Sequence, residues 1–422
     1  MRNNSHDIKI PTITQRANGF PATALSNPNT PELYSIEPNL RTPYNQQWHF
    51  GVQYQMPADT MLDVSYAGSR GLKLFGFYNG NEAALATLPQ YAALCIANFG
   101  GVLACPTAER RPAHAVAPGA PPGSTCDLSP TDDCDPVFDT SIATFRSNDV
   151  SNYNSLQVRF EKRPTHGLQF QAAYTWSHAL DDASSASLGS QNAGDFRLQN
   201  DPLLEYGNAD FDVRQRFVLS YAYDLPFGKN KAFGGNASGV WNQIIGNWQV
   251  AGITIATTGN WYTPTDIATN LSTSDGGGEV ASASRPNVVG NPNGHPCVQG
   301  TLFNTCAFAT NTIVGSFGDA GRNIIQGPGT QNWDISLFKM FPINEEKRLE
   351  FRAEFFNAFN HYDPEFDNPA SFNTNIATQH GLDETAAETG CSNGNPNSNC
   401  AFGFAQAAHD PRFIQFALKF YF

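Results

Sequence analysis

Apolar and polar residues alternate strictly in several short runs of this chain, and a period of two residues is typical of a β-strand with two different faces. The first run, at 46–56, places Trp48, Phe50 and Val52 on one side and glutamines on the other. We expect about nine strands of roughly ten residues. They lie near 46–56, 62–67, 156–161, 168–176, 217–225, 247–258, 333–337, 349–355 and 416–422.

Neighbouring runs fold into hairpins that keep apolar side chains on one face, which a true strand register requires. The first hairpin turns at 57–59 and the second at 164–167. In the run at 247–258 the apolar positions change from one face of the strand to the other, which favours a β-bulge. The expected cross-strand pairs are Tyr54 with Leu62, Val52 with Val64, Phe50 with Tyr66, Phe160 with Phe170, and Arg159 with Gln171.

The connections alternate between short and long. Short ones lie near 57–59, 164–167 and 342–346, with a longer one near 228–245, and long ones near 70–153, 180–212, 259–330 and 359–412. A soluble sandwich rarely carries several long irregular loops, whereas a transmembrane barrel has short periplasmic turns and long extracellular loops. We therefore expect an all-β fold, a partial antiparallel transmembrane β-barrel whose last residue, Phe422, lies on the periplasmic side.

Composition supports this interpretation and excludes other classes. The net charge of -13 argues against a nucleic-acid partner, which requires a basic surface. No run approaches the roughly 20 apolar residues of a spanning helix. The mean hydropathy of -0.37 is compatible with a barrel, because only alternate strand residues face lipid.

Candidate catalytic and metal sites are weak. His178 with Asp181 and Asp182 forms one acidic group, and His361 with Asp363 and Asp367 forms another, but neither has the spacing of a known metal site. No G-x-S-x-G, H-E-x-x-H or phosphate-binding loop occurs. We expect a protein that is not an enzyme and uses no cofactor or metal.

The eight cysteines fall into four close pairs, mostly in loop-like stretches, and predict local disulfides formed in an oxidising compartment. Zinc is the alternative, although tight C-x2-C spacing with histidine partners is absent. Connectivity between residues 95 and 134 stays open. The pairs are Cys95 with Cys105, Cys126 with Cys134, Cys297 with Cys306, and Cys391 with Cys400.

The two faces of the expected strands suggest different roles. Aromatic residues near strand ends would form girdles at the two lipid–water boundaries. Those at the outer ends of their strands are Trp48, Trp176 and Trp333, and those at the inner ends are Phe227, Trp248 and Phe420. Residues of the polar faces would line the lumen. They are Gln53, Asp63, Arg159, Glu161, Gln171, Arg216, Asp224, Glu350, Arg352, Glu354 and Lys419.

The chain is expected to be a fragment. Its start, MRNNSHDIKIPTIT, is not a signal peptide, and bacterial single-chain barrels have an even number of strands. We expect residues 1–44 to be an extracellular loop at a truncated edge and residues 45–422 to be the C-terminal part of a barrel, with its N-terminal strands and any plug absent.

Several segments together resemble the C-terminal half of large TonB-dependent outer-membrane receptors of the Oar-like kind. They are NLRTPYNQQW at 39–48, AYTWSHA at 173–179, DFDVRQRF at 210–217, EFRAEFFNAFNH at 350–361 and the terminal FYF. The last strand resembles the signal read by the outer-membrane assembly machinery, carried by Phe416, Leu418, Phe420 and Phe422.

The resemblance implies a barrel of about 22 strands with a plug in its lumen, located in the bacterial outer membrane. It also implies partners in outer-membrane lipid, the missing plug and strands, the assembly machinery, and TonB through the missing N-terminal region. The function would be energised uptake of an unidentified substrate, with loop residues near 262–290 and 359–400 contributing. A passive porin-like channel or adhesin barrel is the first alternative, and a secreted disulfide-linked β-sandwich that binds sugar or protein is the second.

Overall fold

The computed structural model describes residues 33–79, 87–102, 110, 142–184, 205–264, 285–311, 318–344, 346–364, 403 and 408–422. Within these ranges no helix has the length and apolar character needed to cross a membrane. That finding concerns helices alone and says nothing about strands.

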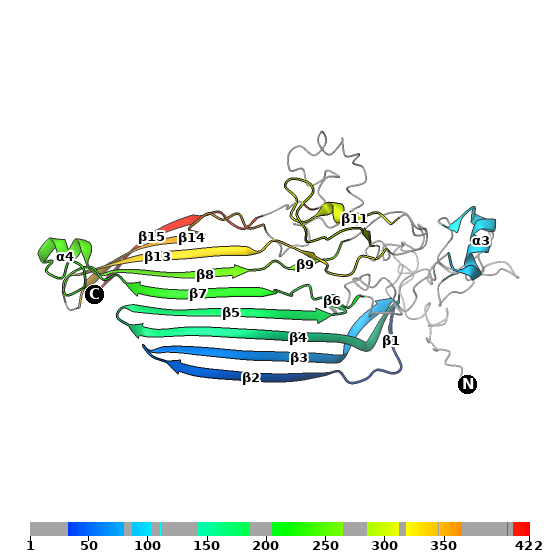
Figure 1. Ribbon diagram of the computed structural model, residues 1–422, viewed down its shortest axis with the longest axis horizontal. Helices are drawn as coiled ribbons and strands as arrows, with labels where there is room; N and C mark the ends of the chain where they lie inside the picture. Colours follow the sequence, from blue (N-terminus) through cyan, green and yellow to red (C-terminus); the bar gives the residue numbers. More distant parts are fainter. Residues whose placement is uncertain are drawn as a thin grey trace, which may run out of the picture.

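One curved sheet of long antiparallel strands dominates the structure (Figure 1). Nine strands follow one another in chain order from edge to edge, and two short strands, β1 and β6, pair beside them. The nine are β2 (Tyr44–Met56), β3 (Thr60–Asn79), β4 (Ile142–Thr165), β5 (Leu168–Asp181), β7 (Gln215–Asp224), β8 (Trp248–Thr257), β13 (Thr330–Pro342), β14 (Arg348–Phe356) and β15 (Phe413–Tyr421). The predicted number of strands and their order are confirmed, and the sheet is open between β2 and β15.

The first hairpin has the predicted register. Tyr54 pairs with Leu62, Val52 with Val64 and Phe50 with Tyr66. The turn residues Ala58 and Asp59 both have positive φ, 62° and 56°, as a tight hairpin turn between right-twisted strands requires.

The second hairpin has a different register from the predicted one. Phe160 pairs with Ala172, and Arg159 pairs with Ala173, so the expected pairs of Phe160 with Phe170 and Arg159 with Gln171 are wrong by two residues. The turn is shorter than expected, because His166 and Gly167 alone adopt positive φ, and a register shift follows between Lys162 and Thr165. The rings of Phe160 and Phe170 still touch diagonally, with centroids 5.5 Å apart.

The bulge expected in β8 is absent, because β8 pairs without a register shift both with β7 and with β13. The slip in the apolar phase has another cause. Trp248 and Val250 lie on one face of β8, while Ile253 and Ile255 lie on the other, opposite Ser220 and Val218 of β7. The second face therefore carries a small apolar area among polar neighbours.

Strands β3 and β4 extend further than the alternation indicated. Their pairing continues to Asn79 and Ala143, beyond the ends expected near residues 70 and 153. Backbone hydrogen bonds hold a strand together wherever it has a partner, while alternation appears only where the two faces meet different surroundings. β1 (Leu33–Ile36) lies parallel to the start of β4 at this same end.

Smaller elements gather at the end of the sheet with long connections (Figure 1). β9 (Trp261–Tyr262) pairs with β12 (Ile325–Gln326), and β10 (Asn287–Val288) pairs with β11 (Phe308–Ala309), which follows the 3-10 helix η5 (Thr305–Ala307). Helix α3 (Pro89–Phe99) and β6 (Gly207–Asn208) also lie there, whereas α4 (Gly239–Ile245) lies at the opposite end, near the C-terminus. Phe303, Ala307, Phe308 and Ile325 form a separate buried core.

Candidate barrel wall and extracellular rim

The continuous register divides the side chains of the sheet into two sets, one on each face. Starting from Phe50 and following the pairs across all nine strands leads to Tyr66, Leu156, Trp176 and then onward to Phe416. We call this the apolar face. Its side chains remain open to the surroundings, with Phe50 71% exposed and Phe416 67% exposed. The expected alternative of a soluble sandwich would bury these rings between two sheets, and the register places them instead on the outside of one sheet.

The opposite side, which we call the polar face, contains every residue predicted to line the lumen. The register places all of them there: Gln53, Asp63, Arg159, Glu161, Gln171, Arg216, Asp224, Glu350, Arg352, Glu354 and Lys419. The structure shows that these side chains share one face; that this face borders a lumen stays a prediction.

Two ion pairs lie on the polar face, one between strands and one along a strand. Arg159 lies 3.5 Å from Asp63 on the adjacent strand, and Arg352 forms an ion pair with Glu350. The Tyr421 hydroxyl donates to Glu350 Oε2 at 3.1 Å. This face therefore presents charged and hydrogen-bonding groups, which suit water or a second polar surface beside it.

A cavity of about 530 Å³ opens on the polar face where β4, β5, β7, β8 and β13 curve. Its lining combines Glu161, Gln171 and Asp334 with the apolar Ile253 and Phe356. The exposed Ile253 explains why the second face of β8 is not uniformly polar. The lining has both hydrogen-bonding groups and apolar surface, as a protein contact would require.

Aromatic residues on the apolar face lie near both ends of the wall. Trp48, Trp176 and Trp333 are nearer the end with the long connections, and Trp248 and Phe420 are nearer the short turns. Phe227 lies in the connection after β7 and contacts Phe233, with ring centroids 5.6 Å apart. This arrangement has the form of two aromatic girdles.

The long-connection end is held together by a buried cluster around Arg322, which we call the rim cluster. Arg322 Nη1 donates to the carbonyl oxygens of Asp181 and Glu205 at 2.9 and 3.3 Å, and Nη2 donates to Asp181 Oδ1 at 2.6 Å. Nη2 also reaches Asp210 Oδ1 at 3.3 Å. One guanidinium thus joins the end of β5, the segment at 205–210 and the loop before β12.

Two of these segments, 205–210 and the loop before β12, meet again beside Arg322. Asn208 Nδ2 donates to Asn323 O at 2.9 Å, and Asn323 Nδ2 donates back to Asn208 O at 2.6 Å. Asn323 has a φ of 52°, a left-handed conformation that asparagine tolerates. A Cβ on Gly207 would lie 2.8 Å from Arg322 O, so this close approach requires glycine.

Asp182, directly after β5 and next to Asp181 of the rim cluster, is a buried carboxylate. Its Oδ1 accepts the Val150 amide at 3.0 Å, while its buried Oδ2 has no partner among the described residues. Burial, aided by the nearby Asp149 charge, raises the pKa of Asp182 to about 6. The folded protein therefore keeps a proton that the unfolded chain releases between about pH 4 and 6. The stability of the rim falls as the pH rises through this window and stays lower above it.

Replacing Asp182 by Asn should stabilise the rim at pH 7.5 by on the order of 2 kcal/mol, because the amide keeps the acceptor for Val150 without a buried charge. The decline in stability between pH 4 and 6 should also become smaller in the variant. Amide hydrogen exchange of residues 142–184 across this range measures both effects. Asp59→Asn, at an exposed turn, is the matched control and should change little. A steeper pH dependence in Asp182→Asn would contradict the assignment.

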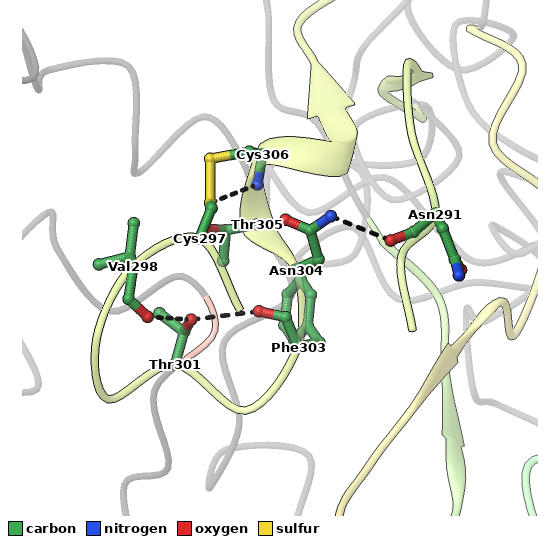
Figure 2. Close-up of a disulfide and its surroundings, with 8 residues drawn as sticks. All are labelled: Asn291, Cys297, Val298, Thr301, Phe303, Asn304, Thr305 and Cys306. Atoms are coloured by element: carbon green, nitrogen blue, oxygen red, sulfur yellow. Dashed lines mark hydrogen bonds between the residues drawn. A yellow bond between two sulfur atoms is a disulfide. The ribbon is translucent and has the colours of Figure 1, made fainter. Parts of the chain in front are cut away.

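The disulfide between Cys297 and Cys306 is confirmed, with Cα atoms 6.1 Å apart. Figure 2 shows the loop that it closes. Thr301 donates to the carbonyl oxygen of Val298 at 2.8 Å, and Asn304 Nδ2 donates to Asn291 O at 3.1 Å. Cys95 is also disulfide-bonded, and it is buried in α3. Cys105, Cys126, Cys134, Cys391 and Cys400 lie outside the described residues.

Replacing both Cys297 and Cys306 by serine should lower the opening free energy of residues 285–311 by about 2–3 kcal/mol, because a short loop closed by a disulfide gains chain entropy when released. Hydrogen exchange should show this loss locally, with β4 and β5 unchanged. The double variant is preferable to chemical reduction, which would also cleave the bond at Cys95. Unchanged protection of 285–311 would show that the small core of Phe303 and Phe308 holds the loop alone.

The acidic groups considered as metal or catalytic sites have structural roles. His178 Nε2 lies 3.0 Å from Asn208 Oδ1, and Asp181 pairs with Arg322. Asp363 Oδ2 accepts the Gln331 amide, and Asp367 lies outside the described residues. No group of histidine, cysteine and acidic side chains able to hold a metal occurs in the part that the structure describes.

The terminal strand has the geometry on which the predicted assembly signal depends. Phe416, Leu418 and Phe420 all lie on the apolar face of the edge strand β15, exposed beside Leu349, Phe351 and Ala353 of β14. That the assembly machinery reads them stays a prediction. Most of the loop regions expected to contact substrate, 265–284 and 365–402, lie outside the described residues.

Comparison with known proteins agrees with this wall. A model of the family described as "Outer membrane beta barrel domain" matches residues 2–415. The comparison with curated proteins gives no match.

Among solved structures, the chain is similar to the outer membrane transporter YddB from Escherichia coli, at 9% identity and a TM-score of 0.40, covering 93% of this chain and 34% of that one. It is similar to the pyoverdine outer membrane receptor FpvA from Pseudomonas aeruginosa, at 10% identity and a TM-score of 0.32, covering 90% and 30%. The chain thus spans about a third of the length of these proteins. Because the TM-scores are low, the assignment rests on the family model and on the two-faced sheet: this chain belongs to the outer membrane β-barrel domain family and is a protein of the bacterial outer membrane.

Proposed function

We propose that this chain forms the C-terminal part of the barrel of a TonB-dependent transporter, which takes up an unidentified substrate across the outer membrane with energy supplied through TonB. The observation that carries the proposal is the open, two-faced wall of nine strands. Its apolar face contacts lipid, and its polar face borders an interior that further strands enclose.

The directions of the edge strands support a larger barrel. In an antiparallel sheet of nine strands, the first and the last run the same way. β2 and β15 therefore cannot close on each other as antiparallel neighbours, and closure needs an odd number of additional strands. An even total is the rule for bacterial single-chain barrels.

The polar face supports a wide interior. Barrels of about eight strands fill their interior with their own side chains. Here Gln53, Gln171, Arg216 and Asp224 remain exposed on the polar face, and the cavity beside Ile253 is open. Such a surface fits a plug with complementary polar and apolar groups, which a TonB-dependent transporter holds in its lumen.

Conductance distinguishes the energised transporter from the passive channel. The complete protein that contains this chain is inserted into planar bilayers in potassium chloride solution. A plugged barrel should conduct little until urea unfolds the plug, and the increase should reverse when urea is removed. High conductance from the start would support a porin-like channel, and low conductance throughout would support an adhesin; either result would overturn the proposal.

A further inference from the structure

The connection between β7 and β8 carries a short helix, α4, at the end of the wall with the short turns (Figure 1). In an outer-membrane barrel this end faces the periplasm. Residues 225–247 include two lysines and no aspartate or glutamate, in a chain whose net charge is -13. The connection is therefore locally basic.

Two contacts attach the end of α4 to the apolar face of the wall. Trp248 Nε1 donates to Ile244 O at 2.9 Å, and Lys339 Nζ donates to Gly246 O. Trp248 and Lys339 are direct cross-strand neighbours on the apolar face. Lys339 is buried, with its ammonium group 5.1 Å from the centre of the Trp248 ring. The C-terminal end of α4 is thus attached to the apolar face of the wall.

Three apolar side chains of α4 are more than half exposed. Val240 is 74% exposed, Trp241 70% and Ile244 53%. Positions i and i+4 lie on one side of a helix, so Val240 and Ile244 share a face, with Trp241 beside it. Leaving such side chains in water forfeits about 1.5–3 kcal/mol for each large residue.

We propose that α4 is an interfacial helix that inserts Val240, Trp241 and Ile244 into the periplasmic leaflet of the outer membrane. The helix is fixed to the lipid-facing side of the wall, so its apolar surface continues that of Trp248. Tryptophan prefers the lipid–water boundary, and a helix with an apolar and a polar side lies in that plane. The exposed Lys229 suits anionic phospholipid headgroups.

Depth-dependent quenching tests the proposal. The protein and its Trp241→Phe variant are reconstituted in phosphatidylcholine–phosphatidylglycerol vesicles with lipids brominated at shallow or deep acyl positions. The difference in fluorescence isolates Trp241, because the remaining tryptophans cancel. We expect the shallow bromolipid to quench this component several-fold more than acrylamide does. Trp261→Phe is the matched control, because Trp261 belongs to β9 at the other end and its component should ignore bromolipid.

Two outcomes would overturn the proposal. Quenching of Trp241 by acrylamide alone would place α4 in water. Resistance to both quenchers would mean that α4 packs against protein, for example a second copy of the chain. If Trp241→Phe alters folding, a lipid that carries a photoreactive group in its headgroup region offers a second measurement on the unaltered protein. Residues 239–245 should then be labelled. Their absence from the labelled peptides would also contradict the proposal.

Discussion

Replacing Arg322 by methionine should release the rim at the long-connection end while leaving the wall intact. Arg322 is 5% exposed and joins three chain segments. Methionine fills much of the same volume but removes every hydrogen bond, and it leaves the carboxylate of Asp181 buried without its cation. Removing one partner of a buried ion pair lowers the free energy of unfolding by about 3–5 kcal/mol.

Limited proteolysis and hydrogen exchange of the protein in vesicles measure this effect. Residues 205–210 and 318–326 should become accessible, while β7 and β13 stay protected. Arg159→Met is the matched control, since Arg159 faces Asp63 at 3.5 Å with both side chains partly exposed. Its loss should cost less than about 1 kcal/mol. Equal effects of the two substitutions would contradict a special role of Arg322.

Replacing Val158 by arginine should destabilise the barrel in vesicles by about 2–4 kcal/mol, because the charge enters the hydrocarbon near the middle of the membrane. Val158 lies on the apolar face of β4, between Val64 and Tyr174. Denaturant-induced unfolding in phospholipid vesicles measures the change. Reduced heat-modifiable migration on gels should accompany it.

Gln157→Arg is the matched control, one residue earlier on the same strand. Gln157 lies on the polar face between Ser65 and Thr175, so its variant should change stability by less than about 1 kcal/mol. The comparison keeps strand, depth and introduced charge constant and changes only the face. If Gln157→Arg were the more damaging variant, the assignment of the two faces to lipid and interior would be reversed.

Much of the wall could be predicted because membrane strands obey a local rule. The pairs of Val52 with Val64 and Phe50 with Tyr66 follow from alternation and a tight turn alone. The same reasoning failed at Phe160, where the positions of His166 and Gly167 in the turn, and the register shift after Lys162, decide the pairing. Alternation fixes the face of a side chain but not a slip by two residues, which preserves the face.

The rim was the part of the candidate site that sequence reasoning missed. Asp181 and Asp182 form an acidic group in the sequence, but nothing near them along the chain indicates a cation. Arg322, the partner of Asp181, lies 141 residues away along the chain. A single arginine in a glycine-rich loop has no periodicity or spacing to mark it, and burial alone gives it its importance.

The sequence by itself determined a wall with one apolar and one polar face, because a sheet one strand thick whose faces meet different surroundings favours a period of two along most of each strand. It also determined the disulfide between Cys297 and Cys306, since a short separation leaves few partners. Only the tertiary structure decided what lies beyond the wall. The extension of β3 and β4, the rim around Arg322, the raised pKa of Asp182 and the attachment of α4 through Lys339 all arise from contacts between distant segments, and such contacts leave no local pattern in the chain.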